Sequence, residues 1–160
     1  MKAAFAGESQ ANRMYLAFAE KAEEEGFAQI ALLFKAAAQA ETVHALNHLR
    51  VMKQVRSTSD NLGTAVSGET YEFKKMYPEF IEEAKKEGNQ KAIVSFDYAN
   101  KVEQIHAGLY QKALDALKNK QELSKVDYYV CPVCGNTFEG STPDLCPICA
   151  TPKEKFMKIQ

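Results

Sequence analysis

Four cysteines lie close together near the C-terminal end of the chain, in two pairs with the spacing C-x2-C. Cys131 and Cys134 form the first pair, and Cys146 and Cys149 form the second, eleven residues further on. Two such knuckles bring four thiolates to one tetrahedral ion, and four sulfur ligands select zinc or iron. Cysteines this tightly clustered indicate metal binding in a reducing compartment rather than a disulfide framework. On the motif alone, a structural zinc ribbon is the first choice.

A second set of metal-ligating residue types recurs earlier in the chain. The spacing Glu-x-x-His occurs in ETVH (41–44) and again in EQIH (103–106), which puts carboxylate and imidazole on one face of a helix. Each motif follows an upstream glutamate at a similar distance. Two such motifs, with one glutamate from each of two other helices, are typical of carboxylate-bridged di-metal bundles. The candidate ligands are Glu8, Glu41, His44, Glu69, Glu72, Glu103 and His106.

The charge of these side chains requires a cation if they face a helical core. Burying several unpaired carboxylates together is prohibitive, and no lysine or arginine lies on the same predicted faces. Oxygen and imidazole ligands fit iron or manganese, and zinc also remains compatible with the spacing. A redox-capable metal pair reverses the preference at the cysteines, because an Fe(Cys)4 centre delivers single electrons and zinc does not.

The elements that must position these residues form an internal repeat with an offset of 62 residues, which relates Tyr15 to Tyr77 and Phe34 to Phe96. Each unit predicts a helix, a glycine break and a second helix. The predicted helices cover 2–25, 27–56, 66–87 and 89–118, and 57–67 is the expected connection. Pro78 is expected to kink the third helix. We therefore predict an all-α fold: a four-helix bundle over 1–125, followed by a small metal-binding module over 126–160, the cysteine module.

Three further side chains lie near the predicted metal site. Tyr15 and Tyr77 follow the acidic positions by one to two turns, so their hydroxyls could orient ligating carboxylates, although both could simply be core residues. His48 is interpreted as a core or interface histidine rather than a ligand.

Composition excludes several classes of protein. The chain has 160 residues, of which 46% are hydrophobic, and a net charge of −1, so we expect a folded protein without nucleic acid as a partner. Its apolar runs are too short to span a membrane, and the first residues lack the apolar core of a secretory signal. A cytoplasmic location without a membrane partner is the resulting expectation.

Taken together, these motifs resemble the rubrerythrin family. The matching segments cover nearly the whole chain: AGESQAN (6–12), AEKAEEEGF (19–27), ETVHA (41–45), GETYE (68–72), MYP (76–78), EQIHAGLY (103–110) and the two cysteine knuckles. The resemblance implies a ferritin-like di-iron bundle joined to a rubredoxin-like Fe(Cys)4 domain. Two departures are a stretch of only seven residues before Glu8 and a short gap between the cysteine pairs, and neither removes a ligand.

The resemblance also implies a role for each predicted ligand. Glu41 and Glu103 match the carboxylates that bridge the two irons. Glu8 matches a terminal ligand of the first iron, whereas Glu69 and His106 match terminal ligands of the second.

In the family, the first iron exchanges a glutamate ligand when oxidised for a histidine ligand when reduced. These two ligands match Glu72 and His44, which gives the additional carboxylate a role. Tyr15 and Tyr77 match tyrosines that hydrogen-bond to ligating glutamates.

By the same resemblance, the expected activity is reduction of hydrogen peroxide to water as protection against oxidative stress. Two non-haem irons and one Fe(Cys)4 iron per chain are the expected cofactors, with zinc substitution compatible. Electrons would come from rubredoxin or an NAD(P)H-dependent reductase. Two alternatives stay open: a ferroxidase or iron-handling protein of the ferritin type, and a non-catalytic zinc-binding module.

The predicted connection between the two helix pairs also bears on assembly. In a ferritin-like bundle the second and third helices run parallel, so their connection must travel the length of the bundle. Residues 57–67 span at most about 36 Å, and the predicted second helix is about 45 Å long. We therefore expect a homodimer in which the helix hairpins are exchanged between subunits.

Overall fold

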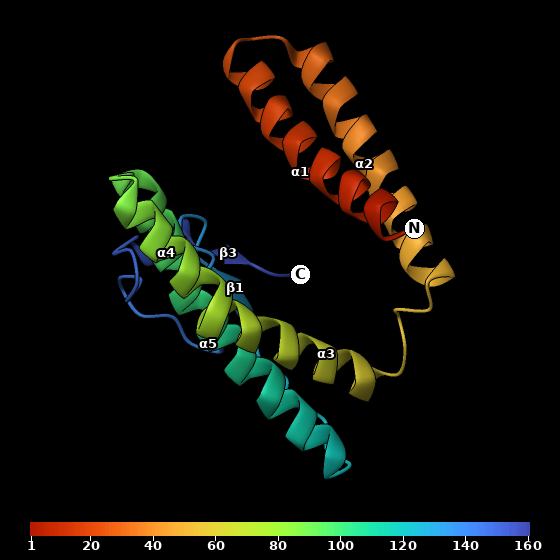
Figure 1. Ribbon diagram of the computed structural model, residues 1–160, viewed down its shortest axis with the longest axis vertical. Helices are drawn as coiled ribbons and strands as arrows, with labels where there is room; N and C mark the ends of the chain where they lie inside the picture. The colour runs from red at the N-terminus through yellow and green to blue at the C-terminus, as the bar shows by residue number, and fades with distance from the viewer. The chain divides into compact units, whose positions relative to one another are not determined.

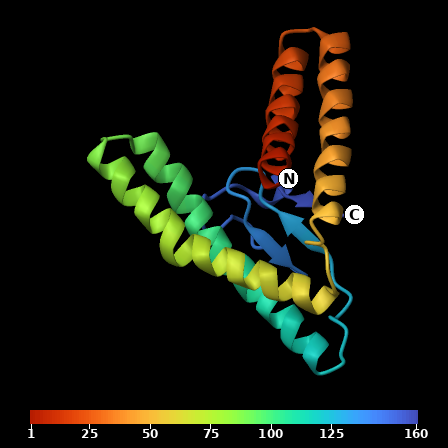
Figure 2. The ribbon, with the colours of Figure 1, turned by 45° about the vertical axis from the view of Figure 1, so that its right-hand side comes forward.

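The computed structural model describes all 160 residues and divides into two units, Met1–Arg56 and Ser57–Gln160. The first unit is a helical hairpin, and the second holds a helical hairpin and a three-stranded sheet (Figures 1 and 2). The predicted all-α architecture with a small C-terminal metal-binding module is confirmed. The predicted boundary at 125/126, between bundle and cysteine module, stays a prediction. The division of the structure lies instead between Arg56 and Ser57, after the first helical hairpin.

The first unit consists of α1 (Lys2–Glu24) and α2 (Ala28–Val51). Gly26 ends α1 in a left-handed conformation, with φ at +82°. This conformation lets the backbone N–H of Phe27 donate to the carbonyl of Ala22 at 2.8 Å, which satisfies an otherwise free helix carbonyl and reverses the chain.

The helical part of the second unit consists of α3 (Thr58–Tyr71), a π-helical segment η1 (Glu72–Met76), α4 (Tyr77–Lys86) and α5 (Gln90–Lys118). Gly88, with φ at +68°, repeats the function of Gly26, and the N–H of Asn89 donates to the Ala84 carbonyl at 2.9 Å. α5 packs against the continuous run of α3, η1 and α4, and the predicted repeat of two helical hairpins is therefore present.

Small residues line the seam between α1 and α2. Ala19, Ala31 and Ala38 are at most 1% exposed, and they let the two backbones approach closely. Large apolar side chains on other faces stay open, such as Phe18 at 42% and Leu33 at 68%. One hairpin thus buries a single seam and leaves further apolar surface without a partner inside its own unit.

The expected connection at 57–67 and the expected helix start at 66 are wrong, because α3 begins at Thr58. Ser57 caps this helix, with its side-chain oxygen accepting from the N–H of Asp60 at 3.2 Å. Such a cap satisfies an N–H that has no intrahelical partner. The segment contains glycines that weaken a helix, yet it stays helical in contact with α5. Only residues 52–57 remain to connect the two hairpins.

The kink expected at Pro78 stays a prediction, and the structure has the π segment η1 just before this residue. A proline lacks the N–H that continues the α-helical pattern. The repeat supplies a further reason: six residues separate Glu8 from Tyr15, whereas seven separate Glu69 from Tyr77. A π turn accommodates one additional residue inside a helix. The second hairpin therefore absorbs a one-residue insertion between a predicted ligand and a predicted orienting tyrosine.

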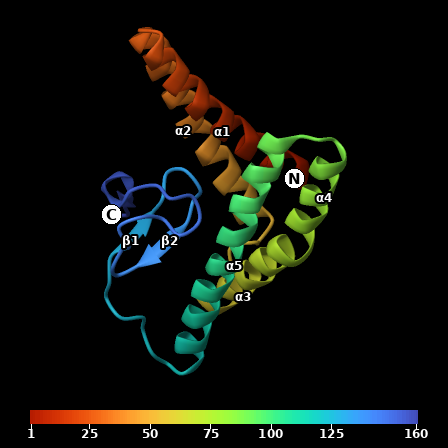
Figure 3. The ribbon, with the colours of Figure 1, turned by 90° about the vertical axis from the view of Figure 1, so that its left-hand side faces the viewer.

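The cysteine module contains β1 (Tyr128–Val130), β2 (Thr137–Glu139) and β3 (Met157–Lys158), with a short 3-10 turn η2 (Lys153–Lys155). The strand order is β2-β1-β3, and both pairings are antiparallel. Phe138 stacks on Phe156 with ring centroids 4.7 Å apart. Figure 3 shows this sheet beside α5, which β2 contacts. None of the helices combines the length and the apolar composition that a membrane span requires.

Candidate metal centres

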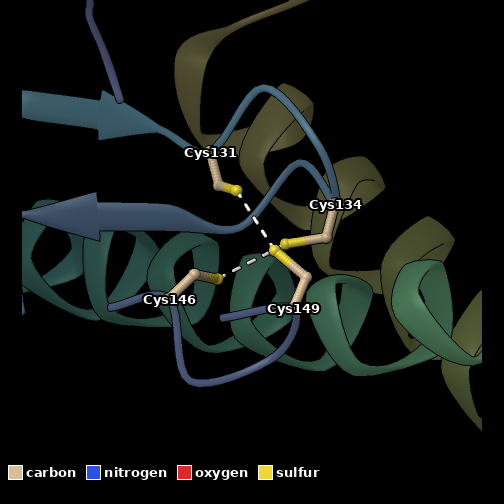
Figure 4. Close-up of side chains that lie close together, drawn as sticks. All are labelled: Cys131, Cys134, Cys146 and Cys149. Carbon is tan, nitrogen blue, oxygen red and sulfur yellow. Dashed lines mark hydrogen bonds between the residues drawn. The ribbon is translucent and has the colours of Figure 1, made fainter. Parts of the chain in front are cut away.

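The four cysteines converge from two loops of the cysteine module (Figure 4). The Sγ atoms of Cys131 and Cys149 are 3.5 Å apart, as are those of Cys134 and Cys146. Disulfide sulfurs would be about 2 Å apart, and all four cysteines are free. Four sulfurs at about 2.3 Å from one ion lie about 3.8 Å from each other. The spacing therefore suits a tetrahedral four-thiolate metal site.

The two knuckles have the same backbone geometry. In the first, the N–H of Gly135 donates to the Cys131 carbonyl at 2.9 Å, and in the second, the N–H of Ala150 donates to the Cys146 carbonyl at 2.9 Å. Gly135 and Ala150 both have positive φ, at +82° and +58°. This conformation aims each pair of sulfurs at the same point. Burial raises the pKa of the Cys134 thiol above its ordinary value. A bound cation reverses this effect, since it replaces the proton on each sulfur.

Glu8 on α1 and the pair Glu41 and His44 on α2 form the first half-site. The Nδ1 atom of His44 lies 2.8 Å from a Glu41 carboxylate oxygen and 4.0 Å from one of Glu8. The imidazole is 54% exposed, and Glu41 is 18% exposed. Three potential ligands thus converge on an open face of the hairpin.

Buried Asn12 fixes the register of the two helices beside the first half-site. Its side-chain amide donates to the Ala38 carbonyl at 2.7 Å and to the Thr42 hydroxyl at 2.8 Å. These bonds hold Glu8 on α1 and Glu41 on α2 at a common level. Asn12 is buried, and a buried side-chain amide needs hydrogen-bond partners within the protein.

Glu69 on α3 and the pair Glu103 and His106 on α5 form the second half-site. The Nδ1 atom of His106 lies 2.7 Å from a Glu103 carboxylate oxygen. Its Nε2 atom lies 2.9 Å from the Thr137 hydroxyl on β2, in the cysteine module. Both ring nitrogens of His106 therefore have partners, and this imidazole is only 26% exposed.

The second half-site contains an excess of negative charge. Burial raises the pKa of Glu69 above its ordinary value, and the neighbouring Glu103 carboxylate adds to the shift. Glu72, at the start of the π segment, has its pKa raised by burial and then by Glu103. Burial also raises the pKa of Tyr77, with Glu72 the largest charged contributor. A divalent cation would relieve this repulsion.

The structure brings the predicted ligands together in two sets of three, with Glu72 adjoining the second set through its electrostatic coupling to Glu103 and His106. Tyr15 and Tyr77 each lie in an aromatic cluster that the repeat reproduces. Tyr15 is 6.1 Å from Phe34, and Tyr77 is 6.3 Å from Phe96, between ring centroids. His48 belongs to neither set of clustered ligands.

Sequence reasoning assigned no role to Thr137, the partner of His106. It lies 31 positions away in sequence from His106. Threonine is common in strands, so its presence there does not indicate a contact with a metal ligand. Only the folded position of the cysteine module reveals this contact. The sequence does contain a signal for the π segment, by contrast: the second repeat has one more residue than the first between its glutamate and its tyrosine.

These features define a class of protein: a helical carboxylate–histidine protein with a rubredoxin-like metal module. The family model described as Rubrerythrin matches residues 1–114, and the model described as Rubrerythrin, rubredoxin-like domain matches residues 129–157. The chain belongs to the rubrerythrin family, whose members are generally oxidoreductases.

Individual relatives match over almost the whole chain. It is 38% identical to Rubrerythrin-2 of Clostridium acetobutylicum, over 98% of this chain and 92% of the relative. It is 36% identical to nigerythrin of Nitratidesulfovibrio vulgaris, over 98% of this chain and 83% of the relative. A solved structure described as the fully reduced, all-ferrous state of nigerythrin matches with a TM-score of 0.62 and 37% identity, covering 99% of this chain and 84% of that one.

Proposed function

We propose that this protein is a non-haem di-iron peroxidase that reduces hydrogen peroxide to water. The reaction consumes one peroxide, two protons and two electrons, and it releases two waters. The single observation that carries the proposal is the hydrogen bond between His106 and Thr137, because it joins a carboxylate–histidine site to the four-cysteine module. Storage or simple oxidation of iron has no use for a one-electron relay in that position.

The proposed ligands of the iron pair come from both half-sites, with one addition from the π segment. Five carboxylates balance the charge of two ferrous ions to within one unit, so neutral imidazoles complete the set. The family and the ferrous state of the similar nigerythrin structure support iron at this place. When bound, the iron pair would supply the two electrons that cleave the oxygen–oxygen bond. The set is Glu8, Glu41, His44, Glu69, Glu72, Glu103 and His106.

The protein side chains hold this charge in place and adjust to it. His44 is the only exposed residue of this set, and its Nδ1 atom contacts a carboxylate of its own hairpin. It is therefore free to turn toward or away from a metal ion. Glu72 offers an anionic alternative from the opposite hairpin. Exchange between a neutral imidazole and a carboxylate would match the ligand charge to the oxidation state.

His106 is held in one orientation. With its Nδ1 atom directed toward the carboxylates, its Nε2–H donates to the Thr137 hydroxyl. A ligating histidine ordinarily donates its second N–H in this way, which fixes the ring and its tautomer. The Thr137 hydroxyl also approaches the Gly135 carbonyl at 3.5 Å, beside the first cysteine knuckle. This chain of contacts is the proposed electron path from the cysteines to the iron pair.

An Fe(Cys)4 centre fits this role better than zinc, which has no redox chemistry. We infer one iron in that site, and rubredoxin or an NAD(P)H-dependent reductase as the electron donor. Four free thiols in a metal site also suit the reducing conditions of a cytoplasm.

The proposal is tested by reducing the iron-loaded protein anaerobically and mixing it with stoichiometric hydrogen peroxide or with dissolved oxygen. We expect peroxide to reoxidise both types of centre much faster than oxygen does. Faster reoxidation by oxygen, with accumulation of a ferric mineral, would instead support a ferroxidase or iron-handling protein. Retention of zinc in both sites without any redox change would support the non-catalytic binding module.

A further inference from the structure

We propose that Asn136 sets the reduction potential of the four-cysteine site, because its side-chain amide donates to a cysteine sulfur and so favours the ferrous state of a bound iron. This inference rests on the iron that we propose for the cysteine site, and it is independent of any reaction with peroxide. It gives a role to a residue that lies outside the two C-x2-C motifs.

The side chain of Asn136 is a buried amide with only part of its hydrogen bonding satisfied. It is 2% exposed, and its nitrogen donates to the Sγ atom of Cys146 at 3.9 Å. Its oxygen is also buried and has no hydrogen-bond partner. A buried acceptor without a partner lowers stability, and an apolar side chain of similar size would avoid that loss. The donation to sulfur is therefore the contact that explains an amide at this position.

The backbone of Asn136 holds the amide in place. Its carbonyl accepts from the N–H of Cys131 at 2.9 Å, which ties the residue to the first knuckle. Burial raises the pKa of the Cys134 thiol, and a hydrogen bond from the backbone of Asn136 opposes this rise. The residue thus contacts both cysteines of the first knuckle through its backbone, and a cysteine of the second knuckle through its side chain.

Thr151 occupies the equivalent position after the second knuckle, two residues beyond Cys149. Its carbonyl accepts from the N–H of Cys146 at 2.8 Å, and its hydroxyl lies 3.0 Å from the Sγ atom of Cys149. This side chain is buried as well, at 6% exposed. Both knuckles therefore place a buried polar side chain against a sulfur. The contact of Asn136 differs in one respect, because it crosses from its own knuckle to the other.

The charge of the sulfurs gives the amide its effect on the potential. When ferric iron bound by four thiolates takes up one electron, the net charge of the site becomes one unit more negative. No proton is taken up, since every thiolate stays bound to the metal. A hydrogen-bond donor stabilises the more negative state more strongly, and hydrogen bonds to the sulfurs are one of the factors that set the potential of such sites. Asn136 therefore raises the potential at which the site accepts an electron from a one-electron donor protein.

A redox titration of the iron-loaded, full-length protein tests the inference without peroxide. Asn136→Leu removes the amide and keeps a side chain of similar size. At a fixed ambient potential, we expect the ratio of ferrous to ferric iron in the cysteine site to fall about tenfold, which is a shift of about 59 mV for one electron. Thr151→Val should shift the midpoint potential in the same direction. Thr142→Val, which lies between the two knuckles and takes part in none of these contacts, is the control.

A merely structural role of Asn136 would weaken the ferric and ferrous forms alike and leave the midpoint potential unchanged. An equal or higher potential in Asn136→Leu than in wild type would therefore overturn the inference, as would an equal fall in Thr142→Val. Asn136→Val replaces the leucine variant where the ferric absorption shows a disturbed site.

The same titration separates this inference from the proposed function. A wild-type cysteine site that takes up zinc but no iron would overturn both the inference and the iron proposed for this site. A shifted potential in Asn136→Leu, in a protein whose wild type leaves peroxide unreduced, would contradict the proposed function alone.

Discussion

The two half-sites contain the same ligand types in different surroundings. In the first half-site the imidazole of His44 is 54% exposed and contacts the carboxylates of Glu8 and Glu41. In the second half-site His106 is 26% exposed and is held from behind by Thr137. The second hairpin also has a π segment and an additional glutamate, Glu72. The first half-site is thus open on its own hairpin, whereas the second is held by a contact with the cysteine module.

This difference has a functional meaning for a site that changes oxidation state. In the proposed mechanism, the ligand that moves lies on the exposed half-site, and the ligands that receive electrons lie on the half-site joined to the cysteine module. Two identical hairpins could offer the same metal ligands. Neither hairpin would then hold a more exposed ligand, and neither would be the one joined to the cysteine module.

The largest expected effect comes from removing a carboxylate that the two metals would share. Glu103→Ala is expected to abolish the iron pair and the peroxidase activity, because it leaves His106 without its neighbour in the second half-site. The Fe(Cys)4 centre should be retained, since its four sulfurs lie in a separate module. Iron analysis and visible absorption measure both sites, and Glu83→Ala on the exposed face of α4 is the matched control. Undiminished peroxide turnover by Glu103→Ala would contradict the assignment.

The π segment can be removed by deleting Lys75, which restores in the second hairpin the spacing that separates Glu8 from Tyr15 in the first. We expect the helices and the cysteine site to persist. Peroxide turnover should fall by about 100-fold, because a shift of about 1 Å at a reacting site has an effect of that size.

Lys74→Ala, which leaves the spacing unchanged, controls for the loss of a charge next to the deletion. Equal turnover by the deletion variant and wild type would show that the insertion has no part in the reaction.

A smaller effect is expected from Thr137→Val, which keeps the shape of the side chain and removes the hydroxyl that meets His106. Loss of such a partner to a ligating histidine typically lowers affinity or activity by about 10- to 100-fold, and we expect about 10-fold here. Both metal sites should still fill, and rapid mixing should show slower electron transfer from the cysteine site to the iron pair. Thr142→Val, outside β2, is the control. A rate equal to wild type would place the electron path elsewhere.

The smallest expected effect concerns the two knuckles, where Gly135 and Ala150 occupy equivalent positions with positive φ. Gly135→Ala should lower the stability of the metal-loaded module by about 1 kcal/mol, because a side chain disfavours this conformation. Its new Cβ would meet Val102 at an ordinary 3.9 Å, so packing adds little. Ala150→Gly should raise the stability slightly. Thermal loss of the Fe(Cys)4 absorption measures both, and shifts in the same direction would contradict the comparison.

Much of this arrangement follows from local patterns in the sequence. The spacing of Glu41 and His44, and of Glu103 and His106, indicates which residues share a helix face, and the cysteine knuckles define their own site. Gly26 and Gly88 mark the hairpin turns because left-handed backbone favours glycine.

Other features depend on tertiary context. The glycine- and serine-rich stretch after Ser57 has weak helix propensity, and its contact with α5 makes it helical. The contact between His106 and Thr137 joins a helix to a strand 31 positions away, so neither helix nor strand periodicity could predict it. The position of the π segment lay in the sequence as a one-residue difference between repeats, but only the structure shows that the difference is absorbed there.

The central claim is that the clustered carboxylates exist to hold a pair of iron ions beside a separate four-thiolate iron. Mössbauer spectroscopy of anaerobically purified, iron-57-loaded protein tests this directly, together with iron analysis per chain. We predict two coupled irons with oxygen and nitrogen ligands for each tetrahedral sulfur-ligated iron. A spectrum that contains the sulfur-ligated iron alone, in protein whose glutamates bind no further metal, would contradict the claim.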